Sequence, residues 1–89
     1  MTELIESWRL EVHDRFYKKL ASLPKGERER ILAALVKLQH NPFEMNLKPL
    51  RGRTDWRLRV GGWRILLRVD ISAKVMIAYE LGVRGDVYK

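Results

Sequence analysis

The sequence predicts a two-layer α+β domain, in which a four-stranded, mostly antiparallel sheet packs on a pair of helices. Two observations predict this fold class. Apolar residues recur at three- and four-residue spacing in the first half and alternate with polar residues in the second half. With 89 residues, the chain buries only roughly 60% of its unfolded surface. We therefore expect a single domain over residues 1–89, without a large cofactor pocket.

The chain starts with a predicted strand and a predicted helix. Residues 8–12 alternate between apolar and polar side chains, which is typical of a short strand. Residues 14–23 have helical spacing, and their apolar side chains fall on one side: Phe16, Leu20 and Leu23. Pro24 and Gly26 then interrupt the pattern, so we expect the first helix to end before them.

A second helix is predicted over residues 25–40. Its apolar positions again share one side: Ile31, Leu35 and Leu38. The charged residues 27–30 are expected to form solvated first turns. Asn41 precedes Pro42 and therefore avoids the helical region, which ends the helix. We interpret residues 42–54 as a loop.

The second half predicts a three-stranded antiparallel meander. Strict alternation over residues 56–60 is followed by Gly61-Gly62, a pair that suits a tight hairpin turn. Residues 63–69 form the return strand, and a turn over residues 70–73 leads to the last strand, residues 74–81. The expected order is therefore one strand, two helices and three strands, with a short tail from Gly82.

A two-residue loop at Gly61-Gly62 fixes the pairing of the hairpin, with Val60 opposite Trp63 and Arg59 opposite Arg64. Since side chains alternate between faces, one face is predicted to join the core: Trp56, Leu58, Val60, Trp63, Ile65 and Leu67. We call the other face the arginine face, and it carries Arg57, Arg59, Arg64 and Arg68. Asp55 is expected opposite Arg68. From the third strand, the arginine face should receive Lys74, Met76, Ala78 and Glu80, and we expect Glu80 to neutralise one of the hairpin arginines.

Positive charge is concentrated in the same half. The whole chain carries 18 Lys and Arg against 11 Asp and Glu, a net charge of +7. Residues 48–89 hold ten of the basic residues but four of the acidic ones, and seven of those ten are arginine. Arginine binds phosphate through a planar fork and stacks on bases. The distribution favours a polyanionic partner, with nucleic acid first and an anionic membrane surface second.

Several classes of function are excluded by composition. The chain has no cysteine, which excludes disulfides and thiolate metal sites. It has two histidines, His13 and His40, which we expect on the surface and which are too few for a histidine-rich metal cluster. No apolar run approaches the roughly 20 residues of a membrane span, and the acidic N-terminus is unlike a signal peptide. We expect a cytoplasmic protein without metal or small-molecule cofactor.

Clustered arginines suit cleavage of RNA by its own 2′-hydroxyl. This reaction needs a proton acceptor, a proton donor and cations around the crowded phosphate. Guanidinium groups supply the cations, but they stay protonated and cannot accept the proton. Glu80 is a candidate acceptor on the arginine face. The residues by themselves leave two readings open, an RNA-binding domain and a nuclease.

Three segments together resemble the RelE family of toxins from toxin–antitoxin systems. They are Lys-Pro-Leu-Arg-Gly at residues 48–52, Trp-Arg-Leu-Arg-Val-Gly-Gly-Trp-Arg-Ile at 56–65 and Gly-Val-Arg-Gly-Asp-Val-Tyr at 82–88. The resemblance runs from Trp8 to the end of the chain and implies the RelE-like fold, which agrees with the element order above. It further implies cleavage of mRNA in the ribosomal A site, translation inhibition and silencing by a cognate RelB-like antitoxin.

The resemblance also implies roles for individual residues. Arg57 and Arg59 fall on two basic residues that contact or activate the scissile phosphate, and Arg64 falls on a phosphate stabiliser. Arg84 matches an arginine that stabilises the transition state or protonates the leaving group, and Tyr88 matches a tyrosine that stacks on a base. We assign further RNA contacts to basic residues around this set: Lys48, Arg51, Arg53 and Arg68.

Two departures from the family bear on the proton acceptor. Arg57 and Arg59 stand where the best-known RelE has lysines, and an arginine is far less able to act as a base. Val83 stands where some relatives have a histidine before the terminal arginine. The base is then Glu80, Tyr88, a ribosomal group or water.

Two alternatives share the fold. ParE-type toxins bind DNA gyrase and lack the catalytic basic set, and a third possibility is an RNA-binding module without turnover.

For the antitoxin, we expect an acidic segment that binds as an amphipathic helix or an added strand. Its apolar contacts would come from aromatic residues of the first half: Trp8, Phe16 and Tyr17.

Overall fold

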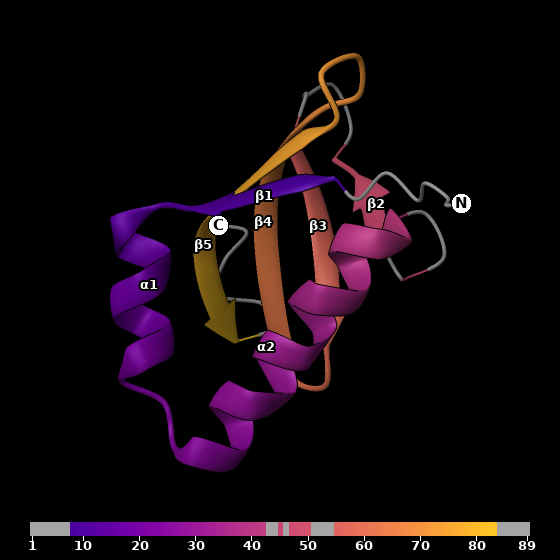
Figure 1. The fold of residues 1–89 in the computed structure, drawn as a ribbon. Coiled ribbons are helices and arrows are strands. Elements are labelled where there is room, and N and C mark those ends of the chain that lie inside the picture. The colour runs from indigo at the N-terminus through magenta and orange to yellow at the C-terminus, as the bar shows by residue number, and fades with distance from the viewer. Residues whose placement is uncertain (1–7, 43–44, 46, 51–54, 84–89) are drawn as a thin grey trace, which may run out of the picture.

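The computed structural model describes residues 8–42, 45, 47–50 and 55–83 (Figure 1). The described elements follow one another as β1 (Arg9–Val12), α1 (Asp14–Ala21), α2 (Lys25–His40), β2 (Leu47–Pro49), β3 (Asp55–Val60), β4 (Trp63–Asp70) and β5 (Val75–Val83). The predicted α+β class is confirmed, as are the leading strand, the two helices and the meander. The first helix ends at Ala21, two residues earlier than expected, and β5 extends two residues beyond the predicted end.

The described strands form one five-stranded mixed sheet in the order β1-β5-β4-β3-β2. β1 runs parallel to β5, and the other neighbours are antiparallel. The prediction of four strands was wrong because β2 lies inside the segment expected to be a loop. This strand has three residues and ends at Pro49, which cannot donate to a ladder and is tolerated at a sheet edge. Such a short segment has no detectable alternation.

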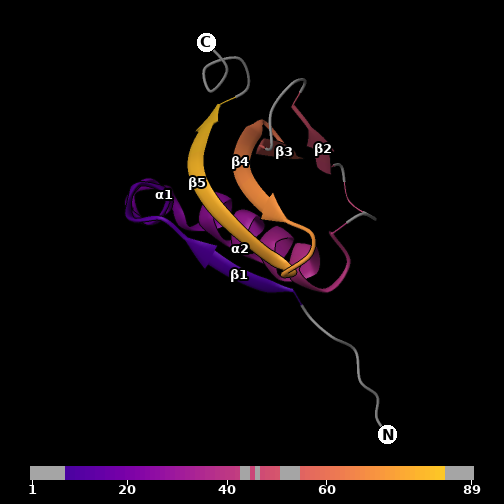
Figure 2. The ribbon, with the colours of Figure 1, turned by 90° about the horizontal axis from the view of Figure 1, so that it is seen from above.

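Both helices cover the same face of the sheet. Figure 1 shows α2 running across β3 and β4 with α1 beside β5, and Figure 2 shows both helices on one side of β4 and β5. The predicted apolar positions of the helices are all buried: Phe16, Leu20, Leu23, Ile31, Leu35 and Leu38. They pack in one cluster with core residues from the strands. The opposite face of the sheet carries the arginines of the hairpin together with apolar residues such as Leu66 and Ile77.

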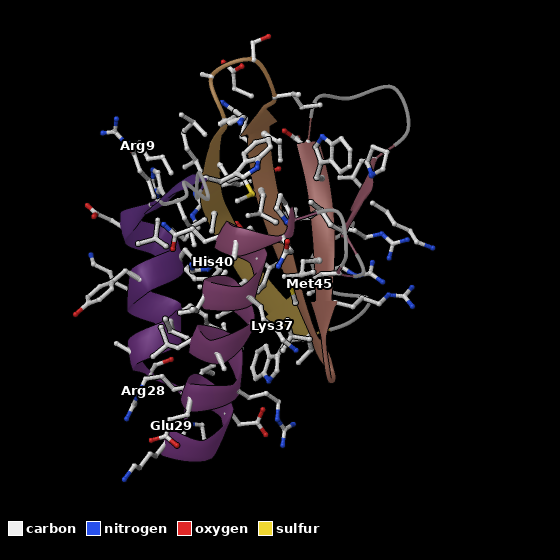
Figure 3. The ribbon with its side chains drawn as sticks, turned by 45° about the vertical axis from the view of Figure 1, so that its right-hand side comes forward. Arg9, Arg28, Glu29, Lys37, His40 and Met45 are labelled. Atoms are coloured by element: carbon white, nitrogen blue, oxygen red, sulfur yellow. The ribbon has the colours of Figure 1, made fainter. Side chains whose placement is uncertain are left out.

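The charged first turns of α2, residues 27–30, are exposed or half-buried. Figure 3 places Arg28 and Glu29 near the start of α2, and Lys37 and His40 near its end. Arg28 is half-buried and donates from Nη1 to the carbonyl oxygen of Leu23 at 3.1 Å, which closes the connection between the helices. In the described part of the chain, neither helix combines the length and apolar character needed to cross a bilayer.

The β3–β4 hairpin has the register that its glycine pair predicts. Val60 lies opposite Trp63 and Arg59 opposite Arg64. Gly61 has a φ of 60°, the left-handed conformation that glycine adopts without steric cost. The turn rests on the start of α2, since Trp63 Nε1 donates to Glu27 Oε1 at 2.6 Å. Glu27 is therefore half-buried and structural, not part of a fully solvated turn.

The faces of β5 differ from the prediction because the strand contains a bulge. Leu66 pairs with Glu80 while Leu67 pairs with Ala78, so that Tyr79 is an extra residue and the alternation shifts there. Met76 and Ala78 consequently lie in the core with no exposed surface, and their predicted position on the arginine face was wrong. Glu80 and residue 81 keep the faces that alternation predicts.

Candidate functional site

The arginine face is formed as the hairpin register predicts, but its four members differ in exposure. Arg68 is exposed, while Arg57 and Arg59 are half-buried. Arg64 is buried, with 6% of its surface exposed. Both Arg59 and Arg64 are engaged in interactions within the protein. A buried guanidinium is costly to desolvate, so its retention here indicates a role other than surface solubility.

The face is organised in rows that run across the strands. One row joins Lys48, Arg57, Leu66 and Glu80 from β2, β3, β4 and β5. The next row joins Arg59, Arg64 and Gly82. Gly82 adds no side chain to this row, so its charged groups are the two guanidinium groups of Arg59 and Arg64. Like charges directly opposite each other weaken a strand pair, so the second row is a local cost to the hairpin.

The carboxylates of this face lie at its margins. Asp55 Oδ1 is 3.7 Å from Arg68 Nε, which confirms the expected pairing of these residues. Glu80 shares the face with the arginines, but Glu80 Oε1 accepts from Arg15 Nη1 of α1 at 2.9 Å. The expectation that Glu80 neutralises a hairpin arginine was therefore wrong, because α1 brings a cation closer. Within the described residues, no carboxylate forms an ion pair with Arg57.

A cavity of about 370 Å³ adjoins the arginine face at the start of α1. Its lining comes from three elements: His13, Arg15, Arg68, Ile77 and Tyr79. Sequence patterns predicted Arg68 as a site residue but gave no indication of Arg15 or Tyr79. The parallel pairing of β1 with β5 brings Arg15 here, and His13 N–H donates to Ala78 O at 2.8 Å. No local pattern in the sequence indicates this position, because it depends on the pairing of the first described strand with the last one.

The remaining predicted site residues do not all fall on described positions. Lys48 is exposed on the edge strand β2 and pairs with Arg57 in the register. Arg51, Arg53, Arg84 and Tyr88 lie outside the described residues. His13 and His40 are exposed, as expected. Among the described residues, no group of three His, Cys, Asp or Glu side chains could hold a metal ion.

The solved structures that resemble the chain carry one fold. The Pyrococcus horikoshii RelE–RelB complex contains a chain with 28% identity and a TM-score of 0.78, over 91% of this chain and 99% of that one. The isolated E. coli RelE toxin has 24% identity and a TM-score of 0.73, over 92% of both chains. The chain has the RelE fold. The resemblance predicted from its motifs is confirmed.

A third RelE-fold structure is the toxin–antitoxin complex RelBE2 of Mycobacterium tuberculosis. It matches with 26% identity and a TM-score of 0.68, over 89% of this chain and all of the matched one. A scan against protein-family models and a search of curated proteins each find no match. The RelE fold therefore rests on three-dimensional structure and on motif spacing.

On this RelE fold, the chain presents a surface that can bind phosphate but offers little proton chemistry. Asp55 and Glu80 are both in ion pairs, and guanidinium groups do not release their protons. The described residues can therefore orient an anion and stabilise added negative charge. A proton acceptor has to come from Glu80 after release from Arg15, from residues outside the described part, or from the bound partner.

Proposed function

We propose that this protein is the toxin of a toxin–antitoxin system and that it cuts mRNA on the ribosome. The RelE-fold neighbours support a toxin of such a system. The observation that carries the nuclease assignment is the arginine face: four arginines from one hairpin, with their register fixed by the Gly61-Gly62 turn. A ParE-like inhibitor of gyrase has no use for this clustered set, so the nuclease is the better supported of the two activities.

The reaction is attack by the RNA 2′-hydroxyl on the adjacent phosphorus. A bond forms between O2′ and phosphorus, and the bond from phosphorus to O5′ breaks, which leaves a 2′,3′-cyclic phosphate and a 5′-hydroxyl. The phosphate gains negative charge in the transition state. Arg57, Arg59 and Arg64 are proposed to stabilise this charge, because preorganised donors act most strongly where charge develops. Arg84 is proposed to stabilise the transition state or to protonate the leaving group. Tyr88 is proposed to stack on a nucleobase of the RNA.

The 2′-hydroxyl proton has to leave during the attack. Glu80 is on the correct face, but Leu66 lies between it and Arg57 in the same row, and Arg15 holds its carboxylate. Neighbouring strands are about 4.8 Å apart, so Glu80 lies roughly 10 Å from Arg57 along this row. We therefore assign the acceptor to the ribosome, to water or to Tyr88 in preference to Glu80. An acceptor supplied by the ribosome would make cleavage dependent on the ribosome.

The proposed antitoxin is an acidic, RelB-like protein. Trp8 and Phe16 are buried in the core, so they are not available as its contacts. Exposed apolar side chains do occur on the outer sides of the helices: Tyr17, Leu32 and Val36. Leu32 and Val36 are four residues apart on α2 and therefore lie on one stripe. An amphipathic helix of the antitoxin would find its apolar contacts there.

The test is a brief pulse of expression followed by mapping of new 5′ ends in cellular RNA. We expect 5′ ends at ribosome-covered positions of mRNA, with little cleavage of free RNA. Arg57→Ala should reduce these ends, whereas Arg9→Ala, which removes an exposed arginine from β1, should leave them unchanged. Intact transcripts together with gyrase-linked DNA breaks would instead establish the gyrase alternative. Growth arrest with neither lesion would indicate the RNA-binding module without turnover.

A further inference from the structure

The cavity beside α1 has a lining suited to an anion. Of the five described residues that line it, two are arginines, a third is His13, and none is a carboxylate. Arg15 and Arg68 come from elements far apart in sequence, yet both contribute to one cavity of about 370 Å³. Ligand cavities in proteins measure about 300–1,000 Å³, so this one has room for a group larger than a bare ion.

Each of the two arginines is held in place from outside the cavity. Arg15 is bound by Glu80 at 2.9 Å, and Arg68 by Asp55 at 3.7 Å. The Arg68 guanidinium also lies over the ring of Tyr79, with its carbon 5.6 Å from the ring centre. A guanidinium carries five N–H donors, so these contacts fix the two side chains while leaving donors for a ligand. Their side chains remain 70% and 67% exposed, which keeps them within reach of a ligand.

The cavity also adjoins the arginine face. Arg68 lies two residues along β4 from Leu66, the cross-strand partner of Arg57. Diagonal neighbours of this kind in an antiparallel pair are about 7–8 Å apart. An RNA strand whose scissile phosphate binds at Arg57 would therefore place its neighbouring nucleotides near Arg68. Ile77 and Tyr79 supply apolar and aromatic surface beside the two cations, as a sugar or base requires.

We propose that this cavity is a second phosphate subsite, which binds a nucleotide unit of the RNA next to the scissile phosphate through Arg15 and Arg68. The assignment rests on the proposed function for the identity of the strand. The ligand chemistry is a phosphate attached to a nucleoside. It has two possible sources, a polynucleotide and a free mononucleotide, and contact with the arginine face favours the polynucleotide.

The test measures binding without cleavage. A fluorescent five-nucleotide RNA with 2′-O-methyl groups cannot react, and its affinity is read by fluorescence anisotropy over a range of salt concentrations. Arg15→Gln and Arg68→Gln should each weaken binding about three- to tenfold. Each should also lower the slope of log affinity against log salt by about 0.7, the value for one lost contact to a single strand. Arg9→Gln is the matched control, since Arg9 is 72% exposed and also ion-paired, but lies outside the cavity.

Equal effects of Arg9→Gln and of the two cavity variants would overturn the proposal, because a general loss of charge would explain all three. Competition by adenosine monophosphate or inorganic phosphate distinguishes the sources. Displacement by the mononucleotide at the affinity of the five-nucleotide RNA would overturn the polynucleotide assignment. The proposal of an RNA subsite would also be overturned if both cavity variants lost antitoxin binding but kept their affinity for RNA. Because no step requires cleavage, failure here is distinguishable from failure of the proposed nuclease activity.

Discussion

The two faces of the β3–β4 hairpin are made by alternating residues of the same strands and have opposite physical characters. Leu58, Ile65 and Leu67 have no exposed surface and pack under the helices. On the other face, Arg59 lies directly opposite Arg64, an arrangement that weakens a hairpin by up to about 1 kcal/mol. The first face provides the stability of the hairpin, whereas the second brings two cations together. Both arginines also take part in other interactions within the protein, so the pair belongs to a larger network of contacts.

Two adjacent leucines provide the sharpest test of this difference. Leu67 is fully buried in the core cluster, whereas Leu66 faces the arginine side and lies outside that cluster. Leu67→Ala should lower the free energy of unfolding by about 2–5 kcal/mol, the usual cost of a cavity in a core. Leu66 is also buried, with 8% of its surface exposed, but it lies outside the core cluster, so Leu66→Ala should cost less than Leu67→Ala. Urea unfolding measures both, and equal losses would show that the faces do not differ in stability as described.

Replacing Arg64 tests the other face. Arg64→Ala should slow cleavage of ribosome-bound mRNA by about 10²–10³-fold, roughly 3 kcal/mol, as for loss of one transition-state donor. Arg64→Lys keeps the charge but loses the planar fork, so an intermediate rate is expected. Rates from 5′-end mapping should be compared at matched stability, because Arg64 is buried. Full growth arrest by the Arg64→Ala chain would contradict its assigned role.

The contact between the helix and the hairpin should have a smaller effect. Glu27→Gln weakens the hydrogen bond from Trp63, and Glu27→Ala removes it. A hydrogen bond to a charged group contributes about 1.5–3 kcal/mol, so the alanine variant should lose up to that amount of unfolding free energy. Glu29→Ala, on an exposed position of the same turn, is the control and should change little. Thermal unfolding measures all three, and a similar loss in the control would exclude a specific contact.

The smallest expected effect is the repulsion between Arg59 and Arg64. A double-mutant cycle with Arg59→Gln and Arg64→Gln isolates this pair from the other contacts of each residue. The coupling should be unfavourable by up to about 1 kcal/mol and should shrink at high salt. Urea unfolding of the four proteins gives the value. A favourable coupling would mean that a shared anion or carboxylate already bridges the two guanidinium groups.

Local signals in the sequence predicted the arginine face correctly, because a two-residue glycine turn fixes a register by counting. The bounds of α2 were predicted for a similar reason, since the Asn41-Pro42 stop is a local steric effect. By contrast, the bulge at Tyr79 depends on how β5 fits β4, and alternation along one strand carries no sign of it. For this reason Met76 and Ala78 were placed on the wrong face.

The candidate site was predictable only where it lies within the hairpin. Arg15 joins it through a parallel pairing between the first and last described strands, which no local pattern encodes. The ion pair between Arg15 and Glu80 then changes the expected role of Glu80 from a neutraliser of the hairpin to a brace for α1. Long-range pairing thus decides which charges meet, whereas the charges themselves are evident from composition.

The pairing of β1 with β5 also sets the order in which this protein can become complete. Arg9 pairs with Val75, so the first described strand has no partner until the last one has been made. Contacts this far apart in sequence form late and slow the folding of small domains. A nascent chain that stops before residue 75 also lacks Glu80, the brace that holds Arg15. If the proposed activity is correct, the fold keeps an enzyme directed at ribosomes incomplete for most of its own synthesis.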